Sequence, residues 1–143
     1  MTISLKKPSS GKESENIDKW ARKEWLKFNR EKGYRYSVKK ERIVAFEGKT
    51  PVGYADYSFT GGVCHLKDLL VSKRARGTGI GKLLVERIEK RARTLKCHKI
   101  ELSTSERHGN LGFYGKMGFE QIGELPDGKF HFTWFLLEKK LKQ

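Results

Sequence analysis

Residues 69–82 read LLVSKRARGTGIGK, an apolar stretch that passes through a basic, glycine-rich turn into a segment whose apolar residues have helical spacing. A strand followed by a glycine-rich turn and the N-terminus of a helix forms an anion site. Glycine lets backbone N–H groups approach a phosphate, and the helix dipole favours negative charge. Three glycines stand at alternate positions: Gly77, Gly79 and Gly81. Four basic residues surround them: Lys73, Arg74, Arg76 and Lys82. The stretch predicts a site for a phosphate-bearing ligand, and the alternative is a tight turn that binds nothing.

Two other phosphate-binding loops do not match these residues. A Walker loop requires a glycine where Arg76 stands, and a Ser or Thr at the position of Leu83 to bind magnesium. A dinucleotide-binding fingerprint that begins at Gly77 requires a third glycine where Lys82 stands, and it follows a strand of a βαβ unit. The strand before this turn instead ends an antiparallel meander. We therefore expect neither a nucleoside-triphosphate site nor a dinucleotide site.

The rest of the chain predicts strands before the turn and alternating helices and strands after it. From Ile80 to Leu95 apolar residues recur at three- and four-residue steps, which indicates an amphipathic helix. The predicted elements are a strand at 2–7, a helix at 14–32, strands at 42–47, 52–59 and 63–71, the helix from Ile80, a strand at 99–104, a short helix at 109–117, and strands at 119–124 and 129–138. In the last strand, one face would carry Phe130, Phe132, Trp134 and Leu136. This order predicts an α/β fold with a mixed sheet, in one domain that spans residues 1–143.

The pattern Arg76-x-x-Gly79-x-Gly81 resembles the Arg/Gln-x-x-Gly-x-Gly/Ala signature of the GNAT acetyltransferases, in which this loop holds the pyrophosphate of acetyl-CoA. Residues 69–71 match the Leu-x-Val end of the family's preceding strand, and residues 110–119, NLGFYGKMGF, are similar to its later motif. The resemblance extends from about residue 63 to the C-terminus. It implies the GNAT fold, in which helices flank a central, mixed, mostly antiparallel and splayed sheet. It also implies that acetyl-CoA is the acetyl donor and co-substrate.

The resemblance assigns the donor side of the site residue by residue. The expected acetyl-CoA contacts are Leu69, Leu70, Val71, Arg76, Gly77, Thr78, Gly79, Ile80, Gly81, Lys82, Asn110 and Phe113. In the family, a bulge at the strand end exposes a backbone N–H toward the thioester carbonyl, which would make Val71 or its neighbour Leu70 the donor. Many members have an asparagine at the position of Arg107 and a small residue at that of Asn110. Some branches place an asparagine at the second position, so Asn110 is assigned as a cofactor contact.

Tyr114 matches the tyrosine that the family places near the cofactor sulfur, and a phenol of pKa about 10 can donate a proton to a departing thiolate. The alternative for Tyr114 is packing at a helix end. An attacking amine must be neutral, so we expect a carboxylate base. Asp68, in the strand that leads to the glycine-rich loop, is the first candidate and Glu101, in the adjacent strand, the second, although a surface role fits either. The four histidines follow no motif, and we expect structural roles for them, with a position facing the cleft as the alternative for His65.

Charge is uneven along the chain. There are 31 Lys and Arg residues and 17 Asp and Glu residues, a net charge of +14. Residues 1–40 hold 12 basic and 5 acidic side chains, and residues 61–100 hold 11 and 3. Such a basic half suits a polyanion or a phosphate-rich cofactor, and a solvated lysine-rich surface is the alternative. The two cysteines and four histidines show no zinc-binding spacing, so we expect no metal. No apolar run could cross a membrane or serve as a signal peptide, so the expected location is the cytoplasm.

These observations predict an acetyl-CoA-dependent N-acetyltransferase in which an amine attacks the thioester directly. No motif distinguishes a small-molecule acceptor from a protein acceptor. One alternative is a basic nucleic-acid-binding module, which the charge and aromatic residues such as Trp20, Tyr34 and Tyr36 favour. Another is a non-catalytic GNAT domain that binds acetyl-CoA as a sensor. We also consider an acidic or nucleic-acid partner for residues 1–40 and a homodimer, which is common in the family, and we expect no membrane partner.

Overall fold

The computed structural model describes residues 1–142, which form two compact units. The first unit is Met1–Ser37, and the second begins at Val38. All strands of the protein's sheet belong to the second unit. Within the described residues, no helix combines the length and the apolar character needed to cross a membrane.

The first unit contains one long helix, α1 (Gly11–Glu31), with a clear signal at each end. At its start, the Ser10 hydroxyl accepts a hydrogen bond from the Glu13 amide at 3.1 Å, which satisfies one of the free donors of the first turn. At its end, Gly33 adopts a φ of 85°, and the next amide donates to the Asn29 carbonyl at 3.0 Å. The helix predicted at 14–32 is therefore confirmed, and it begins three residues earlier than expected.

The strand predicted at residues 2–7 is wrong. Ile3 and Leu5 alternate with polar residues, but both side chains are exposed, and no strand of the described chain pairs with this segment. Alternation produces a strand only where a partner strand supplies the hydrogen-bond ladder.

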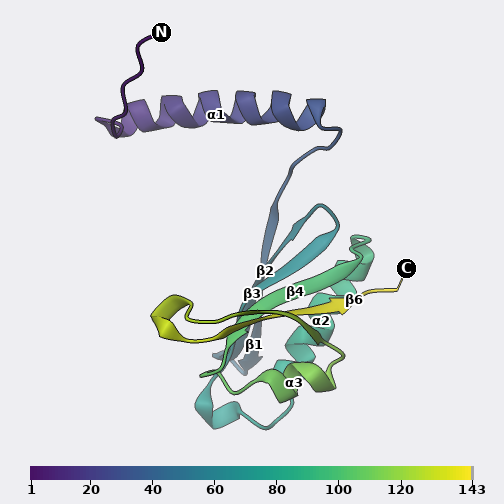
Figure 1. Ribbon diagram of the computed structural model, residues 1–143. Coiled ribbons are helices and arrows are strands. Elements are labelled where there is room, and N and C mark those ends of the chain that lie inside the picture. The colour runs from purple at the N-terminus through teal and green to yellow at the C-terminus, as the bar shows by residue number, and fades with distance from the viewer. Residues whose placement is uncertain (143) are drawn as a thin grey trace. The chain divides into compact units, whose positions relative to one another are not determined.

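The second unit is built on a six-stranded sheet with the strand order β1-β2-β3-β4-β6-β5. Its strands are β1 (Lys39–Glu47), β2 (Thr50–Thr60), β3 (Val63–Val71), β4 (Lys99–Ser105), β5 (Glu120–Leu125) and β6 (Trp134–Lys140). The neighbours β3 and β4 are parallel, and the other four neighbouring pairs are antiparallel. The predicted mixed, mostly antiparallel sheet is confirmed (Figure 1).

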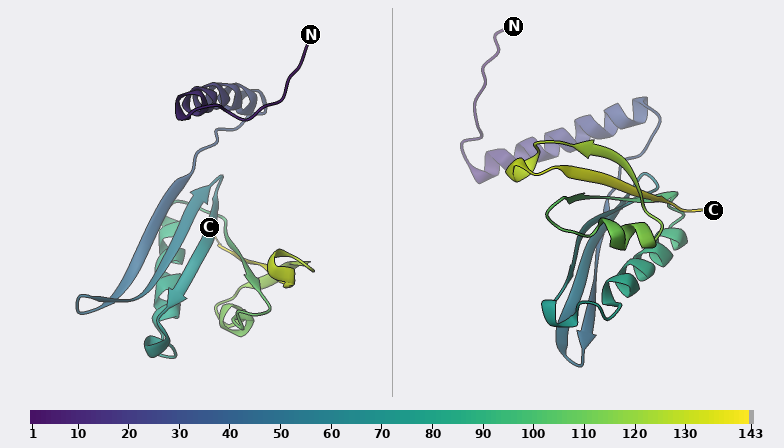
Figure 2. Two further views of the ribbon diagram at one scale, coloured as in Figure 1. Left: turned by 90° about the vertical axis from the view of Figure 1, so that its left-hand side faces the viewer. Right: turned by 60° about the horizontal axis from the view of Figure 1, so that its bottom comes forward.

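The sheet is splayed at its parallel pair. β3 and β4 form ladder pairs only between residues 63–65 and residues 99–101, at the beginning of both strands. Beyond His65 and Glu101 the two strands form no further pairs, and they diverge toward their C-terminal ends (Figure 2). Their backbone groups on the facing edges are therefore free of the ladder along the second half of each strand.

Helix α2 (Ile80–Thr94) runs along the sheet and contacts β1, β2, β3 and β4 (Figure 1). Gly53 of β2 permits this approach, because a Cβ atom there would lie 3.2 Å from Ile80 Cγ2 and 3.4 Å from Leu84 Cδ1. A short helix, α3 (Leu111–Lys116), follows β4. Two 3-10 turns complete the unit, η1 (Lys73–Ala75) and η2 (Lys129–His131).

One apolar core lies within the second unit and joins α2, α3 and four strands. The sheet contributes Ala55, Tyr57, Phe59, Cys64, Leu66, Ile100, Leu102 and Leu137. The helices and the segments after them contribute Val85, Ile88, Ala92, Cys97, Tyr114 and Phe119, and Leu141 joins the core directly after β6. The helix predicted from Ile80 is therefore confirmed together with its buried face.

The last strand starts later than predicted. Residues 129–131 form the turn η2, in which Phe130 and His131 both have φ near 60°, and β6 begins only at Trp134. Consecutive left-handed residues cannot continue a strand, so Phe130 does not share the face of Trp134 and is 77% exposed. The prediction of a strand from residue 129 is wrong for its first five residues.

Candidate acetyl-CoA and acceptor site

The loop between β3 and α2 has the backbone that the glycine pattern predicted. Gly77 and Gly79 have φ values of 78° and 89°, a region that residues with a Cβ rarely adopt, and a Cβ atom on either would meet no atom within 4 Å. Gly79 directly precedes α2, and no side chain of the described residues caps the helix start. The N–H groups of the first turn are therefore available to an anion.

Two side-chain hydrogen bonds hold this loop in place. The Arg76 Nε–H donates to the Val71 carbonyl at 3.1 Å, and the Thr78 hydroxyl donates to the Ala75 carbonyl at 2.5 Å. Ala75 is buried and anchors the 3-10 turn in the fold. The loop is thus shaped by contacts within the chain.

A pocket of about 420 Å³ lies over the loop. It is lined by Leu69, Val71, Ala75, Arg76, Gly77, Gly79, Ile80, Gly81, Lys82, Asn110, Phe113 and Tyr114. The predicted acetyl-CoA contacts all line it except Leu70 and Thr78. A Cβ at Gly81 would lie 3.3 Å from the Phe113 ring, so this glycine allows the ring to pack against the helix start. Open glycines, free helix amides and basic side chains make the pocket fit for a cofactor that carries a pyrophosphate.

The ladder between β2 and β3 determines which backbone amides face the splay. The Ser72 amide donates a hydrogen bond to the Val52 carbonyl at 2.8 Å. Along an antiparallel ladder, residue pairs that exchange backbone hydrogen bonds alternate with pairs that do not. Leu70 and Tyr54 therefore form a hydrogen-bonded pair of the ladder, and the Leu70 amide points toward β2. The amide of Val71 points away from β2, so of the two expected donors Val71 is the one that this ladder leaves available.

The bulge in β3 lies upstream of the expected place. Asp56 pairs with Asp68 and Tyr57 pairs with Leu66, so Lys67 is the extra residue. An extra residue reverses the alternation of side chains. Before the bulge Leu66 faces the core, and after it Leu69 does, opposite the fully buried Ala55. Asp68 consequently lies on the other face.

A second pocket, of about 410 Å³, lies between the diverging strands β3 and β4. It is lined by His65, Leu66, Lys67, Asp68, Leu69, Leu102, Ser103, Thr104, His108, Asn110, Tyr114, Lys129 and Trp134. Leu69, Asn110 and Tyr114 line both pockets. These three residues mark the place where a ligand in one pocket meets a ligand in the other.

Tyr114 is 5% exposed and packs edge-on against Phe113 and Phe119, at centroid distances of 5.0 and 5.4 Å. Burial raises the pKa of Tyr114 to about 12, so the phenol keeps its proton at neutral pH. Asn110 is oriented by Thr104, whose hydroxyl donates to Asn110 Oδ1 at 2.8 Å. Because Asn110 Oδ1 accepts this hydrogen bond, the side-chain N–H₂ group of Asn110 remains available to donate to a ligand.

The structure separates the two candidate carboxylates. Asp68 lines the second pocket, and no cation of the described residues forms an ion pair with it. Arg42 instead binds the opposite carboxylate, Asp56, at 2.6 and 2.8 Å. Glu101 lies 3.4 Å from Lys99, and it lines neither pocket.

The sequence prediction placed none of three further residues of the second pocket in the site: His108, Lys129 and Trp134. They come from the segment after β4, from η2 and from the start of β6. No local pattern joins them, because only the fold brings these segments together. Within residues 1–142, no group of three or more His, Cys, Asp or Glu side chains is arranged to hold a metal ion.

Comparison with known proteins agrees with this geometry. A profile of the "Acetyltransferase (GNAT) family" matches residues 8–119. A "Glucosamine 6-phosphate N-acetyltransferase" from Trypanosoma brucei brucei is 39% identical over 57 residues, which cover 40% of this chain and 37% of that protein. The match thus spans less than half of that relative's length.

Two solved structures share the fold over most of the chain. An acetyltransferase from Bacillus cereus superposes with a TM-score of 0.77 at 20% identity and covers 96% of this chain and 98% of its own. A "Ribosomal-protein-alanine N-acetyltransferase" from Brucella melitensis has a TM-score of 0.61 at 26% identity, with 85% of this chain and 78% of its own covered. The splayed sheet, the order of the elements and the matched profile agree, and this chain belongs to the GNAT family of acetyltransferases.

Proposed function

We propose that this protein transfers an acetyl group from acetyl-CoA to the amine of an acceptor, and that the acceptor's amine attacks directly. The observation that carries the proposal is the pair of pockets that share Leu69, Asn110 and Tyr114. One pocket has the features of a pyrophosphate site, and the other is open, polar and of small-molecule size. A sensor that only binds acetyl-CoA has no need of the second pocket, so the pair favours catalysis over sensing.

On the donor side, acetyl-CoA supplies an acetyl group that is already activated as a thioester. The chain supplies the first-turn amides of α2 and the side chains of Arg76 and Lys82 for the phosphates. The Val71 amide is free of the β2 ladder, and it suits the oxygen of a carbonyl because a backbone amide needs no reorganisation when charge develops.

On the acceptor side, Asp68 accepts the amine's proton, directly or through a water molecule. A base is needed because a free amine of pKa about 10.4 is mostly protonated at neutral pH. Tyr114, where the pockets meet, holds a proton that can be donated to the leaving sulfur. Asp68 and Tyr114 both belong to the second unit, so neither proton transfer requires a group from the first unit.

The cysteines support direct attack over a covalent enzyme intermediate. Cys64 and Cys97 are 0% and 2% exposed, and neither is among the described residues that line the two pockets. Burial raises the pKa of both thiols, that of Cys64 to about 12, so a nucleophilic thiolate is disfavoured at either position.

Release of free CoA tests the proposal. Purified protein with acetyl-CoA is offered a panel of amines: glucosamine 6-phosphate, which the curated relatives suggest, together with a polyamine, free amino acids and a peptide with a free N-terminus. We expect thiol release that depends on at least one amine and falls at least about 100-fold in Asp68→Asn at pH 7. Calorimetry should show tighter binding of acetyl-CoA than of ATP or NAD. No measurable affinity for acetyl-CoA would contradict the proposal.

A further inference from the structure

The second pocket, which Asp68 lines, also carries a cluster of residues that the proposed reaction does not use. The ammonium group of Lys129 lies 5.7 Å from the centre of the Trp134 ring, and the His108 ring lies 5.9 Å from the same centre. All three residues line the pocket. We call this group the Lys129–His108–Trp134 cluster.

The cluster is built by contacts with the backbone. The Trp134 indole N–H donates to the Lys129 carbonyl at 3.1 Å, which ties the η2 turn to β6. Gly128 makes room for the indole, because a Cβ there would lie 2.7 Å from Trp134 Cδ1. The Trp134 ring thus holds the η2 turn, which carries Lys129, in place.

His108 is oriented by Ser105, which is 1% exposed. The Ser105 amide donates to His108 Nδ1 at 3.2 Å, and the Ser105 hydroxyl lies 2.6 Å from the same nitrogen. Since Nδ1 accepts a backbone hydrogen bond, the neutral ring carries its proton on Nε2. The cluster therefore offers an ammonium group and an oriented N–H donor.

The acidic groups nearest in sequence to the cluster are already engaged. Asp127 pairs with His131 at 2.6 Å, and Glu106 accepts a hydrogen bond from the Thr133 amide at 3.1 Å. Within residues 1–142 no carboxylate forms an ion pair with Lys129. Lys67 also lines the pocket, so its only carboxylate, Asp68, is outnumbered by two ammonium groups. An anion bound at the cluster would meet the Lys129 ammonium group, which pairs with no carboxylate of the described residues.

We propose that the Lys129–His108–Trp134 cluster binds an anionic group, a phosphate or a carboxylate, of a small acceptor whose amine reaches Asp68. This inference rests on the proposed acetyl transfer and names the class of acceptor: small amines that carry an anion. The pocket's volume of about 410 Å³ lies in the range of small-molecule sites, roughly 300–1,000 Å³. Because Asp68 and the cluster line one pocket of this size, one small molecule would carry both the amine and the anion.

Three acceptors that differ only at one end test the inference: ethanolamine, O-phosphoethanolamine and β-alanine. We expect the value of kcat/KM to be about tenfold or more higher for one or both anionic amines than for ethanolamine, because a hydrogen bond to a charged group is stronger than one to a neutral group. Glucosamine and glucosamine 6-phosphate form a second matched pair. The better of phosphate and carboxylate identifies the anion. Equal values for neutral and anionic amines would overturn the inference.

Variants then locate the subsite. Lys129→Gln and His108→Gln should raise KM for the anionic amine by about tenfold to a hundredfold, and the loss in kcat/KM should be at least about tenfold larger for the anionic amine than for ethanolamine. The control is Lys49→Gln, which removes the same charge from the turn between β1 and β2 and lines neither pocket. If Lys49→Gln matches Lys129→Gln, the preference comes from net charge alone and the inference is wrong.

Binding without turnover separates this inference from the proposed function. Calorimetry of the wild-type protein with O-phosphoethanolamine and with inorganic phosphate should show binding that Lys129→Gln weakens by the same factor. If no amine is acetylated but this binding is present, the subsite stands and the proposed activity fails. If acetylation occurs and neither anion binds more weakly to Lys129→Gln, the activity stands and the subsite fails.

Discussion

At the scale of single residues, Tyr114 joins the two pockets and is itself part of the core. Its burial keeps the phenol protonated, because removing the aromatic ring and oxygen from water disfavours the charged phenolate and so raises the pKa. The same burial makes it a weaker acid than an ordinary tyrosine. Packing and catalysis, which the sequence presents as alternatives for this residue, are therefore compatible: the ring packs against Phe113 and Phe119 while the residue lines both pockets.

Tyr114→Phe should slow acetyl transfer by about 10²–10⁴-fold, the usual contribution of a general acid or base. Acetyl-CoA affinity should stay within a few-fold, because the ring and its contacts remain. Single-turnover kinetics and calorimetry measure the two effects. With the pKa of Tyr114 at about 12, the wild-type rate should also show no loss from phenol ionisation up to about pH 11. Tyr54→Phe, on a tyrosine that lines neither pocket, is the control. An unchanged single-turnover rate in Tyr114→Phe would reduce Tyr114 to a packing residue.

At the scale of elements, the turn before α2 depends on glycine for two different reasons. Gly79 has a left-handed backbone, whereas Gly81 gives space to the Phe113 ring. Valine at position 79 would strain the backbone by about 1–3 kcal/mol, and valine at position 81 would push the ring away from the pocket wall. The two substitutions should therefore damage the same pocket by distinct routes.

Gly79→Val and Gly81→Val should each abolish measurable acetyl-CoA binding in calorimetry while circular dichroism retains most of the helical signal. The control is Gly11→Ala in α1, where φ is not left-handed and a Cβ meets no atom within 4 Å. Normal affinity in a folded Gly79→Val would show that the phosphates bind elsewhere.

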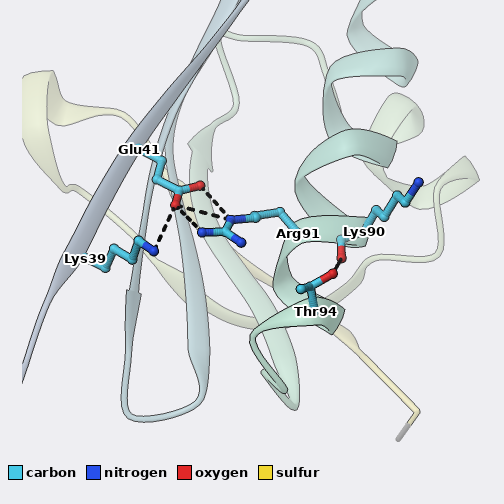
Figure 3. A network of polar contacts seen from close by, with 5 residues as sticks. All are labelled: Lys39, Glu41, Lys90, Arg91 and Thr94. Carbon is cyan, nitrogen blue, oxygen red and sulfur yellow. Dashed lines mark hydrogen bonds and ion pairs between the residues drawn. The ribbon is translucent and has the colours of Figure 1, made fainter.

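A partly buried ion pair connects α2 to the first strand of the sheet. The Arg91 guanidinium donates to both carboxylate oxygens of Glu41, at 2.9 to 3.2 Å, and Lys39 lies 3.6 Å from the same carboxylate (Figure 3). These contacts hold the pKa of Glu41 below its usual value, and the hydrogen bond from Arg91 is the main cause. A carboxylate with a lowered pKa stabilises the fold above its unfolded pKa and loses that contribution as the pH falls.

Glu41→Gln should lower the free energy of unfolding by about 1 kcal/mol at pH 7, the size measured for well-formed partly exposed pairs. Below about pH 4 the difference from wild type should shrink, since the wild-type carboxylate is then being protonated as well. Urea unfolding at pH 7, 5 and 3.5 measures this trend. Glu124→Gln, at an exposed position without an ion pair among the described residues, should cause little change. A difference that grows at low pH would contradict the prediction.

The elements with strong periodicity could be predicted from the sequence, and the irregular ones could not. The meander and α2 follow directly from alternation and helical spacing, because both are covered on one face by the core. The left-handed Phe130 has no sequence signal, since a bulky residue without a short polar side chain rarely adopts this conformation. The bulge at Lys67 also has no sequence signal, although it determines which face of the sheet Asp68 occupies and which face Leu69 occupies.

The two sides of the site differ in the same way. The donor side lies largely on one continuous segment, so the motif predicted nearly every residue of its pocket. The pocket that we propose for the acceptor is assembled from β3, β4, α3, η2 and β6 across the splay. His108 and Trp134 are brought together only by the antiparallel pairing of β4 with β6, in which Ser105 stands opposite Trp134. Long-range pairing of this kind leaves no local pattern to detect.

At the scale of the whole molecule, the charge of +14 exceeds what the site uses. Lys23, Lys27 and Arg30 of α1 follow each other at steps of four and three residues, so they lie on one face of the helix, and all three are exposed. They belong to the first unit, whereas every residue that lines the two pockets belongs to the second. Binding of an anionic partner to this face can therefore be measured separately from acetyl-CoA binding.

We predict that this face of α1 binds a polyanion and that the triple variant Lys23→Glu, Lys27→Glu, Arg30→Glu loses the binding. Each phosphate contact with single-stranded RNA contributes about −0.7 to the slope of log affinity against log salt, so losing three contacts should make the slope shallower by about 2. Fluorescence anisotropy with single-stranded RNA, duplex DNA and an acidic peptide at several salt concentrations measures the slopes. Acetyl-CoA affinity is the internal control and should not change, because the pocket that we propose for acetyl-CoA lies in the second unit. If wild type and variant bind every polyanion equally weakly at low salt, the excess charge serves solubility, and α1 has no anionic partner.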